Sequence, residues 1–368
     1  MKIVSVEAIP FRIPMRKDVG SITSAVVKMD SAEHVLVRVK TDDGVEGFGE
    51  AHERPTIYGE TQQSIVRVIT RHIGPAIMGM DPFALERIFD KADKYGTNYT
   101  ARGALDVAMH DLLGKILGLP VCTLLGGWES EKVPAAAVLS IYTPEKTAEK
   151  ARALQEQYGV KAFKIKVGID PERDVLAIKA IREAVGDGCT LYADANQGYT
   201  PAVAIRTIQR MEAHGLAWVE EPVQKWDYEG KKRVAASIGI PILLDESVWT
   251  PEDVMNNIRN GLGGMISIKA VRTGFYKSRK IANIAAAANI PCLTGTGRDS
   301  AIGAVANAHI IAGFKNVLMG ELTDFTLYED TMLTEPLVLK DGFFYLPKGP
   351  GLGIRLDEKK LAHYRVNM

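Results

Sequence analysis

The chain has 368 residues, of which 46% are hydrophobic and 24% charged, and this composition excludes disordered, collagen-like and disulfide-scaffold proteins. Lysine plus arginine and aspartate plus glutamate balance at 45 each, so no basic excess indicates a nucleic-acid or membrane partner. There is no long apolar stretch, Glu7 interrupts the N-terminal segment, and Cys122, Cys189 and Cys292 lack metal-binding spacing, so we expect a soluble, cytoplasmic protein with buried thiols.

The N-terminal part of the chain, residues 1–125, is predicted to be an α+β domain in which strands precede helices. Apolar and polar residues alternate in three segments, and an Asp-Asp-Gly turn at 42–44 joins the last two as a hairpin. Helical periodicity follows in three further segments. The predicted strands cover residues 2–9, 34–40 and 44–50, and the predicted helices cover residues 61–77, 82–95 and 101–117.

The next part, residues 126–334, shows a different rhythm in which eight short apolar runs alternate with amphipathic segments. This rhythm predicts a (β/α) barrel of parallel strands. The rival fold, an open doubly wound sheet, normally carries a Gly-rich phosphate turn after its first strand, and none is present. No full helix follows the eighth run, and residues 335–368, with a predicted hairpin, are expected to complete the N-terminal domain. The runs are 133–141, 162–167, 190–193, 216–219, 242–244, 265–268, 291–293 and 317–319.

Charged residues stand at the ends of successive barrel strands. Asp194, Glu220 and Asp245 are 26 and 25 residues apart, and Lys269 follows 24 residues later, so each falls at the same phase of its βα unit. They should ring the C-terminal mouth of the barrel, where barrel enzymes place catalytic groups. Three close carboxylates repel one another unless a cation neutralises them, and ligands that offer only oxygen favour Mg²⁺ or Mn²⁺. One such carboxylate alone could be a helix cap, but the shared phase favours a metal site.

Three lysines are candidates for acid/base chemistry. Lys164 and Lys166 lie two apart on one predicted strand and share a face, which core packing does not explain. Each is expected to lower the pKa of the other, so that a neutral lysine can act as a base and a protonated one as an acid. Lys269 ends the sixth strand and is expected to lie across the barrel mouth from Lys166.

At these residues the sequence resembles the enolase superfamily, and within it the muconate lactonizing subgroup. The resemblance covers nearly the whole chain and implies an α+β capping domain over a (β/α)₇β barrel. It is carried by Lys164-Ile165-Lys166, Asp194-Ala195-Asn196, Glu220-Glu221-Pro222, Asp245-Glu246-Ser247, Ile268-Lys269, Arg272-Thr273-Gly274 and residues 54–61.

The resemblance also implies roles for these residues. Asp194, Glu220 and Asp245 correspond to Mg²⁺ ligands, and Lys166 and Lys269 to the acid/base lysines. Lys164 would be an electrostatic helper. Chemistry in the family passes through a metal-stabilised enediolate formed next to a carboxylate. The candidate substrate-binding residues are Tyr58, His52, Asn196, Thr296, Arg298 and Glu321.

The substrate is implied less directly. Residues 32–39, 58–61 and 349–353 most resemble muconate cycloisomerases, which convert cis,cis-muconate to muconolactone in aromatic catabolism through an enolate that a lysine protonates. The alternative is a racemase or epimerase of N-acylamino acids that uses the same lysines and metal. Dipeptide epimerases carry Asp-x-Asp after the eighth strand, where this chain has Glu321-Leu322-Thr323. Sugar-acid dehydratases carry a histidine in the loop that is here 294–300, and this loop has none.

Several points stay open in the sequence. Arg298 could bind a distal carboxylate of the substrate or pair with Asp299. Residues 18–24 and 54–61 could close over the barrel mouth and bring Tyr58 or His52 to the substrate. A catalytically silent barrel would be expected to have lost a ligand or a lysine, and none is lost. The resemblance also implies a homo-oligomer, either a dimer or an octamer.

Overall fold

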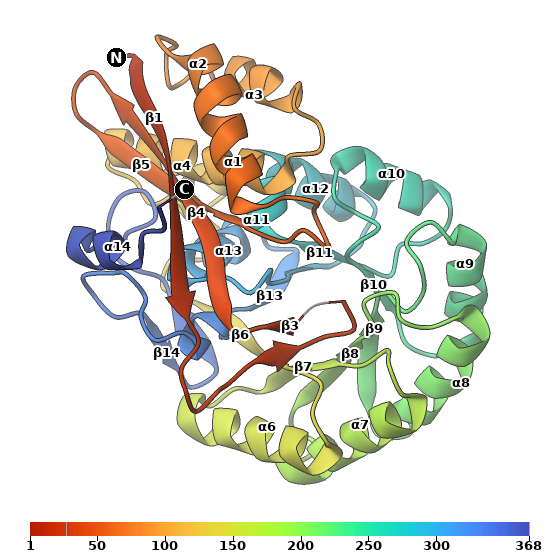
Figure 1. Cartoon of the computed structure of the whole chain (residues 1–368). Coiled ribbons are helices and arrows are strands. Elements are labelled where there is room, and N and C mark those ends of the chain that lie inside the picture. Colours follow the sequence, from red (N-terminus) through yellow and green to blue (C-terminus); the bar gives the residue numbers. More distant parts are fainter. Residues whose placement is uncertain (27, 368) are drawn as a thin grey trace.

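The computed structural model describes residues 1–26 and 28–367 and consists of a sheet-and-helix domain placed on one side of a closed barrel (Figure 1). In the first domain, three antiparallel strands in the order β1-β4-β5 pack against helices. The elements are β1 (Ile3–Pro14), β2 (Ile22–Thr23), β3 (Lys28–Met29), β4 (Ser31–Thr41), β5 (Glu46–His52), α1 (Gln62–Val68), the π-helix η1 (Ile69–Ile73), α2 (Gly74–Ile77), α3 (Leu85–Asp93), α4 (Tyr99–Leu117) and α5 (Val121–Leu125).

Helix α4 packs directly on strand β5. A Cβ atom at Gly49 would collide with the backbone carbonyl of Ala104, so only glycine allows the strand and the helix to approach this closely. The alternating residues that follow on β5, Glu50 and His52, are fully or nearly fully buried. Strand β5 is therefore held by α4 in the position from which it reaches the barrel.

The sequence-based prediction of this domain differs from the structure in two places. The helix expected over residues 61–77 is divided by the π-helical turn η1, and Pro75, which has no N–H to donate, lies in the first turn of α2. The short hairpin β2–β3 was not expected from the sequence. It lies over the barrel strands in Figure 1.

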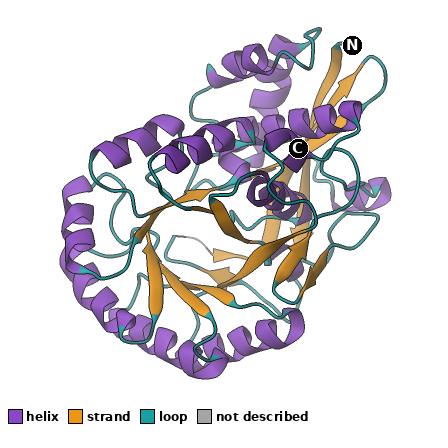
Figure 2. Cartoon of the chain, turned by 180° about the vertical axis from the view of Figure 1, so that it is seen from behind, coloured by secondary structure: helices purple, strands orange, loops and turns teal. Residues whose placement is uncertain are grey.

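The barrel contains eight parallel strands and is closed by pairing between β13 and β6. Helices surround the strands (Figure 2). The strands are β6 (Lys132–Leu139), β7 (Ala162–Lys166), β8 (Thr190–Asp194), β9 (Leu216–Glu220), β10 (Ile242–Leu244), β11 (Met265–Ile268), β12 (Cys292–Thr294) and β13 (Val317–Glu321). The helices are α6 (Pro144–Tyr158), α7 (Pro171–Val185), α8 (Pro201–Glu212), α9 (Tyr228–Ser237), α10 (Pro251–Arg259), α11 (Ala270–Thr273), α12 (Tyr276–Ala287) and α13 (Ala301–Gly313), and a short 3₁₀ helix η2 (Asp324–Leu327) follows β13. The predicted (β/α)₇β barrel with an N-terminal α+β domain is confirmed.

Side chains of alternate residues point into the barrel and change from apolar to charged toward the C-terminal ends of the strands. The apolar interior includes Ala162, Tyr192 and Trp218 in one cluster and Leu243, Met265 and Leu293 in another. Two residues further along β7, β8 and β9 stand Lys164, Asp194 and Glu220. The apolar layers support the charged groups from below.

The C-terminal segment first joins the barrel and then the N-terminal domain. The hairpin of β14 (Val338–Lys340) and β15 (Phe343–Tyr345) pairs with β6, so the expectation that the hairpin returns to the N-terminal domain is wrong. Beyond it, the segment that includes α14 (Glu358–Tyr364) reaches that domain, because Arg365 bridges to Phe11. Met368, the last residue of the predicted segment 335–368, lies outside the described residues.

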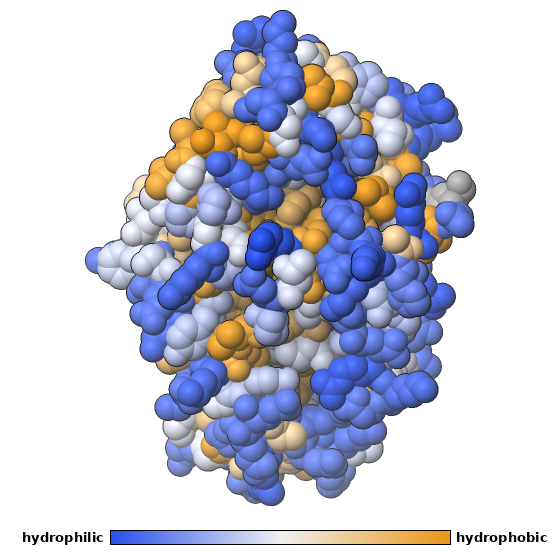
Figure 3. Space-filling view, turned by 90° about the vertical axis from the view of Figure 1, so that its left-hand side faces the viewer, coloured by the Kyte–Doolittle hydropathy of each residue, from blue (hydrophilic) through white to orange (hydrophobic). Residues whose placement is uncertain are grey.

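The face with β1 and α14 is mainly hydrophilic, with apolar side chains gathered in its upper half (Figure 3).

His309 on α13 connects these parts of the chain and is fully buried. Its Nδ1 accepts a hydrogen bond from the backbone N–H of Cys122 at 3.2 Å, and its Nε2 lies 3.2 Å from the carbonyl oxygen of Leu352. Burial lowers the pKa of His309 to about 4. The ring is therefore neutral in the native protein near pH 7.

We predict that His309 makes the protein less stable in mild acid. Between about pH 6.5 and the native value, the unfolded chain binds a proton at His309 that the native protein does not bind. The free energy of unfolding should therefore fall as the pH falls, by up to about 1.4 kcal/mol per pH unit from this group. Urea unfolding at several pH values gives the free energy of unfolding as a function of pH. This free energy should depend less steeply on pH in His309→Gln than in the wild-type protein. An unchanged slope would contradict a neutral buried His309.

Candidate active site

The charged residues at the strand ends meet at the C-terminal mouth of the barrel. Asp194 and Glu220 end the neighbouring strands β8 and β9 and lie opposite each other in the ladder. Lys166 on β7 lies opposite Asp194 on its other side. Asp245 directly follows β10, the next strand in the barrel. Three carboxylates are therefore presented by three adjacent strands.

Lys164 lies at the centre of these carboxylates. Its Nζ is 2.9 Å from Asp194, 2.8 Å from Glu220 and 2.9 Å from Glu321. Although burial opposes the charged form, the three carboxylates hold the pKa of Lys164 well above its ordinary value. The expectation that paired lysines lower each other's pKa is thus wrong for Lys164, because its carboxylate neighbours outweigh Lys166.

Lys166 and Lys269 face the carboxylates from opposite sides of the barrel, since β7 and β11 are four strands apart in a ring of eight. Lys166 Nζ lies 2.6 Å from Asp194 Oδ2 and 2.9 Å from Asn196 Oδ1. Lys269 Nζ lies 2.5 Å from Asp245 Oδ2. Burial opposes the charge of Lys269, but Asp245 raises its pKa above the ordinary value. Both lysines are therefore paired with carboxylates of the cluster.

Gly295 and Arg272 support Lys269 and Asp245. A Cβ atom at Gly295 would meet the side chains of Lys269 and Ser267, so a glycine leaves room for the lysine. Arg272 on α11 donates to Asp245 Oδ1 at 2.5 Å and to the carbonyl of Ser267 at 2.8 Å. Sequence reasoning gave Arg272 no role, although it lies one helical turn after Lys269.

A small cavity of about 50 Å³ lies above the charged cluster and receives residues from both domains. Part of its wall is formed by Ser24 and Val26, between β2 and β3, and by Ile57 and Tyr58 from the first domain. Of the predicted site residues, the cavity is lined by Tyr58, Asn196, Thr296 and Arg298 together with Lys166, Asp245 and Lys269. Arg54, Glu246, Trp249 and Arg272 also line it and were not predicted to do so.

Two predicted substrate-binding residues lie elsewhere. His52 is fully buried beside the cavity wall, where its Nδ1 lies 3.1 Å from the carbonyl oxygen of Gly297. Glu321 is occupied by Lys164, by the Tyr192 hydroxyl at 3.2 Å and by the Thr296 N–H at 2.9 Å. Neither side chain is among those that line the cavity.

Arg298 adopts a left-handed backbone conformation with φ of 71° in the loop after β12. Its guanidinium lies 3.2 Å from Asp324 and 3.4 Å from the Ser140 hydroxyl. The predicted alternative of a pair with Asp299 is wrong, because Asp299 instead accepts hydrogen bonds from Asn307 and from the Gly297 N–H. Such backbone conformations concentrate at functional sites, and Asn196 and Glu221 share the positive φ.

The carboxylate cluster fits a divalent cation. Two buried oxygens at the mouth, Glu220 Oε2 and Glu246 Oε2, have no hydrogen-bond partner among the described residues. Burial, together with the neighbouring Asp194, raises the pKa of Glu220 well above its ordinary value. A hard cation would supply the missing partner and the missing positive charge. Asp194, Glu220 and Asp245 are the residues that would hold it.

Comparisons with known proteins assign both parts of the chain to one superfamily, in agreement with the observed fold. A family described as the mandelate racemase / muconate lactonizing enzyme N-terminal domain matches residues 9–126, and an enolase C-terminal domain-like family matches residues 146–360. The chain belongs to the muconate lactonizing subgroup of the enolase superfamily. Members of this superfamily depend on a divalent metal ion.

Similar members of the superfamily catalyse more than one reaction. The structure of a muconate lactonizing enzyme from Mycobacterium smegmatis, complexed with muconolactone, is 37% identical with a TM-score of 0.96 and full coverage of both chains. A hydrophobic dipeptide epimerase from Enterococcus faecalis is 33% identical over 96% of this chain and 99% of its own. An N-succinyl-L-Arg/Lys racemase from Bacillus cereus is 30% identical over 100% of this chain and 98% of its own.

Strand β5 of the first domain is hydrogen-bonded to the end of the barrel loop that carries Arg298. Glu50 accepts hydrogen bonds from the N–H and hydroxyl groups of Ser300 and from the N–H of Gly303, at the start of α13. His34 and His52 lie 2.7 and 2.8 Å from Glu50 Oε1. Although burial opposes its charge, these two histidines hold the pKa of Glu50 well below its ordinary value. Glu50 thus caps a barrel helix from the neighbouring domain.

By distance alone, His34, Glu50 and His52 could also hold a metal ion. The two imidazole rings are nearly parallel, however, with 7° between their planes and 4.0 Å between their centres. A metal ion binds a ring nitrogen in the plane of the ring, so two stacked rings cannot direct their nitrogens at one ion without strain. The stacked geometry therefore disfavours a metal centre formed by all three residues.

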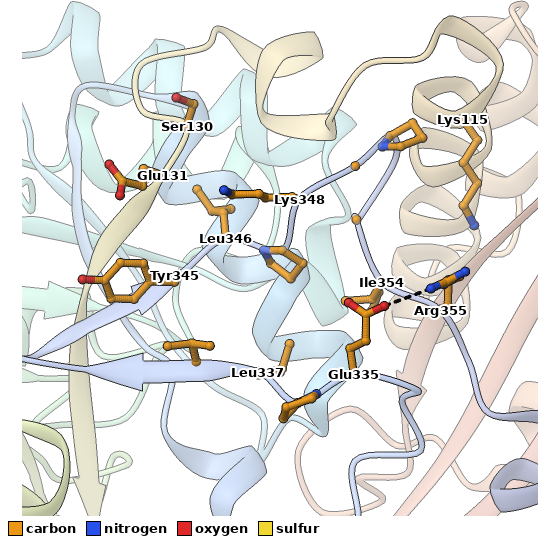
Figure 4. Close-up of a pocket in the computed structure, with 16 residues that line it drawn as sticks. Lys115, Ser130, Glu131, Glu335, Leu337, Tyr345, Leu346, Lys348, Ile354 and Arg355 are labelled. Atoms are coloured by element: carbon orange, nitrogen blue, oxygen red, sulfur yellow. Dashed lines mark hydrogen bonds and ion pairs between the residues drawn. The ribbon is translucent and has the colours of Figure 1, made fainter.

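A larger groove of about 860 Å³ lies at the opposite end of the barrel, beside the residues that precede β6 (Figure 4). Its ion pair between Glu335 and Arg355 is exposed, with 76% and 79% of the two side chains accessible. Lys115 in its wall is already bonded to Asp111 and to the carbonyl of Glu46. The groove therefore offers no buried, convergent charges comparable to the barrel mouth.

No helix in the described part of the chain is long and apolar enough to cross a membrane.

We predict that Glu50→Gln destabilises the protein by about 2–4 kcal/mol, because an amide NH₂ replaces an acceptor that faces backbone N–H donors. Urea unfolding at pH 7 measures this change. Glu46→Gln on the same strand is the matched control, since Glu46 is half-exposed and pairs with Lys40. The control should change stability by less than about 0.5 kcal/mol. Equal effects of the two substitutions would contradict the capping role of Glu50.

Proposed function

We propose that the protein is a muconate cycloisomerase that converts cis,cis-muconate to muconolactone. The observation that carries this proposal is the pair of lysines, Lys166 and Lys269, on opposite sides of the carboxylate cluster in a small cavity. Such a pair can deliver a proton to the carbon next to a substrate carboxylate. The similarity over the full chain to a structure that holds muconolactone supports muconate as the substrate.

The proposed reaction is a ring closure followed by protonation. An oxygen of one carboxylate forms a bond to the conjugated diene, and the electron pair of the broken π bond moves to form the enolate of the other carboxylate. A lysine ammonium then gives its proton to the α-carbon and is reprotonated from solvent. A divalent cation, when bound by Asp194, Glu220 and Asp245, supplies positive charge that stabilises the enolate. Lys164 adds buried positive charge beneath the site.

The surroundings of the cavity disfavour a dipeptide substrate, whose ammonium group needs a carboxylate partner. Glu321, in the position after β13, is occupied by Lys164, Tyr192 and Thr296. Asp324 accepts hydrogen bonds from Arg298 and from Thr296. The two carboxylates near the end of β13 are thus already paired with cations of the protein.

The second candidate is a racemase of N-acylamino acids, in which one lysine removes the α-proton and the other returns it. The equivalent pairing of Lys166 and Lys269 with carboxylates, and the similarity to an N-succinyl-L-Arg/Lys racemase, support this reaction class. Cycloisomerisation needs one proton donor, whereas racemisation needs both lysines.

The proposal is tested by ultraviolet absorbance of cis,cis-muconate with purified protein and Mg²⁺. We expect loss of the diene absorbance, and we expect EDTA to stop this loss and added Mg²⁺ to restore it. Absence of turnover, together with exchange of the α-proton of N-succinylamino acids in D₂O, would replace the cycloisomerase by the racemase.

Substitution of the proton-donating lysine should remove the reaction while leaving the fold unchanged. We expect Lys166→Met or Lys269→Met to lower kcat by at least about 100-fold, because a positioned acid contributes about 10²–10⁴-fold. Circular dichroism checks the fold, and the variant with the larger loss identifies the donor. If both variants kept wild-type kcat, neither lysine would be the proton donor.

We also propose a reducing cytoplasmic location, which is supported by the three free, buried thiols of Cys122, Cys189 and Cys292.

A further inference from the structure

Arg54 is a buried cation in the wall of the active-site cavity. Only 5% of its surface is exposed, and it lines the cavity together with Tyr58 and Arg298. Its Nε and Nη2 donate to the carbonyl oxygen of Gly297 at 3.2 and 2.7 Å, and its Nη1 donates to the carbonyl of Glu53. Within residues 1–26 and 28–367, no carboxylate oxygen lies within 4.0 Å of its nitrogens. The guanidinium therefore has hydrogen-bond partners but no carboxylate in direct contact.

The other cations around the cavity each have a carboxylate partner. Lys166 pairs with Asp194, and both Lys269 and Arg272 pair with Asp245. Arg298 lies 3.2 Å from Asp324, longer than the 2.7–2.9 Å that is usual for such pairs. Arg54 differs from all of them.

The side chains that line the cavity include more cations than carboxylates. Five cationic side chains line it, and only two carboxylates do so. The cationic side chains are Arg54, Lys166, Lys269, Arg272 and Arg298, and the carboxylates are Asp245 and Glu246. Four of these cations are paired with carboxylates, so the charge of Arg54 is the one that a carboxylate of a ligand would pair with.

An uncompensated buried guanidinium is unfavourable, and arginine does not relieve this cost by losing its proton. Five N–H groups belong to the guanidinium, and the carbonyls of Gly297 and Glu53 accept three of them. One N–H remains on each of Nη1 and Nη2. A carboxylate accepts such a pair of N–H groups and supplies the missing negative charge.

We propose that Arg54 binds a second carboxylate of the substrate, so that the protein selects dicarboxylates over monocarboxylates. This inference rests on the proposed function in one respect, which is that a first substrate carboxylate is bound at the cation site beside Lys166 and Lys269. Arg298, which directly follows Gly297, lines the same wall of the cavity. Muconate and N-succinylamino acids both carry two carboxylates, whereas an unmodified dipeptide of neutral residues carries one carboxylate and one ammonium group.

Equilibrium binding tests this selection without turnover. Isothermal titration of the full-length protein with saturating Mg²⁺ compares adipate, a six-carbon dicarboxylate, with hexanoate, the matching monocarboxylate. We expect the wild-type protein to bind adipate about 10–100-fold more tightly than hexanoate, as one charge-assisted carboxylate site allows. Equal affinities would overturn the proposal.

Two Arg54 variants and a matched control assign the preference. Arg54→Met should weaken adipate binding by at least about tenfold and change hexanoate binding less than about twofold. Arg54→Lys, which keeps the charge, should retain part of the preference and serves if the first variant does not fold. The control is Arg182→Met, since Arg182 also donates to backbone carbonyls, including that of His214, but does not line the cavity. A preference that survives in both Arg54 variants at the wild-type value would overturn the assignment.

The two proposals fail separately. If the wild-type protein prefers adipate through Arg54 but does not consume muconate, the dicarboxylate site stands and the cycloisomerase is wrong. If the protein consumes muconate and Arg54→Met leaves KM unchanged, the cycloisomerase stands and the role of Arg54 is wrong.

Discussion

Compensation of buried charge at the barrel mouth is the constraint on which the rest of this structure depends. Asp194, Glu220 and Asp245 lie on adjacent strands, and ionised carboxylates at such depth are stable only with positive charge close by. Lys164 supplies one such charge from below, and Lys166 at the end of β7 and Lys269 directly after β11 supply others from the sides. The unpartnered oxygen of Glu220 marks the place where this compensation is incomplete without a cation.

The first domain completes the site because three alternating polar residues stand at the end of strand β5 and just beyond it. Glu50, His52 and Arg54 all contact the loop and helix start at residues 297–303. Glu50 and His52 share one face of β5, as the period of two requires, and Arg54 reaches the same loop from just beyond the strand. These residues therefore join the domains, fix the loop that carries Arg298 and present a cation to the cavity. Loss of these contacts would affect the cavity even though Glu50 and His52 do not line it.

The barrel and its charged strand ends could be predicted from the sequence because both follow a local repeat. An apolar run of three to eight residues, a turn and a helix recur along the chain, and the carboxylates stand at a constant phase of this repeat. The β2–β3 hairpin has only two residues in each strand, too few to give a pattern. The π-helical turn arises where Pro75 interrupts helical bonding, which periodicity alone does not detect.

The parts of the site that were missed depend on contacts between distant residues. Arg54 and Gly297 are 243 residues apart, and Glu50 and Ser300 are 250 apart, so no spacing in the sequence indicates these pairs. The pKa of Lys164 was predicted in the wrong direction because its neighbour Lys166 was visible in the sequence and its three carboxylate partners were not. His52 is only two residues before Arg54, which lines the cavity, but its ring is directed toward Glu50.

Binding of Mn²⁺, followed by electron paramagnetic resonance, tests the central account of the barrel mouth most directly. We predict one tightly bound Mn²⁺ per chain in the wild-type protein, loss of tight binding in Glu220→Gln, and retained binding in Glu50→Gln. The first substitution removes charge from the carboxylate cluster, and the second changes the contacts of Glu50 with His34, His52 and the start of α13, away from the cluster. Undiminished binding in Glu220→Gln, or loss of binding in a folded Glu50→Gln, would contradict the account.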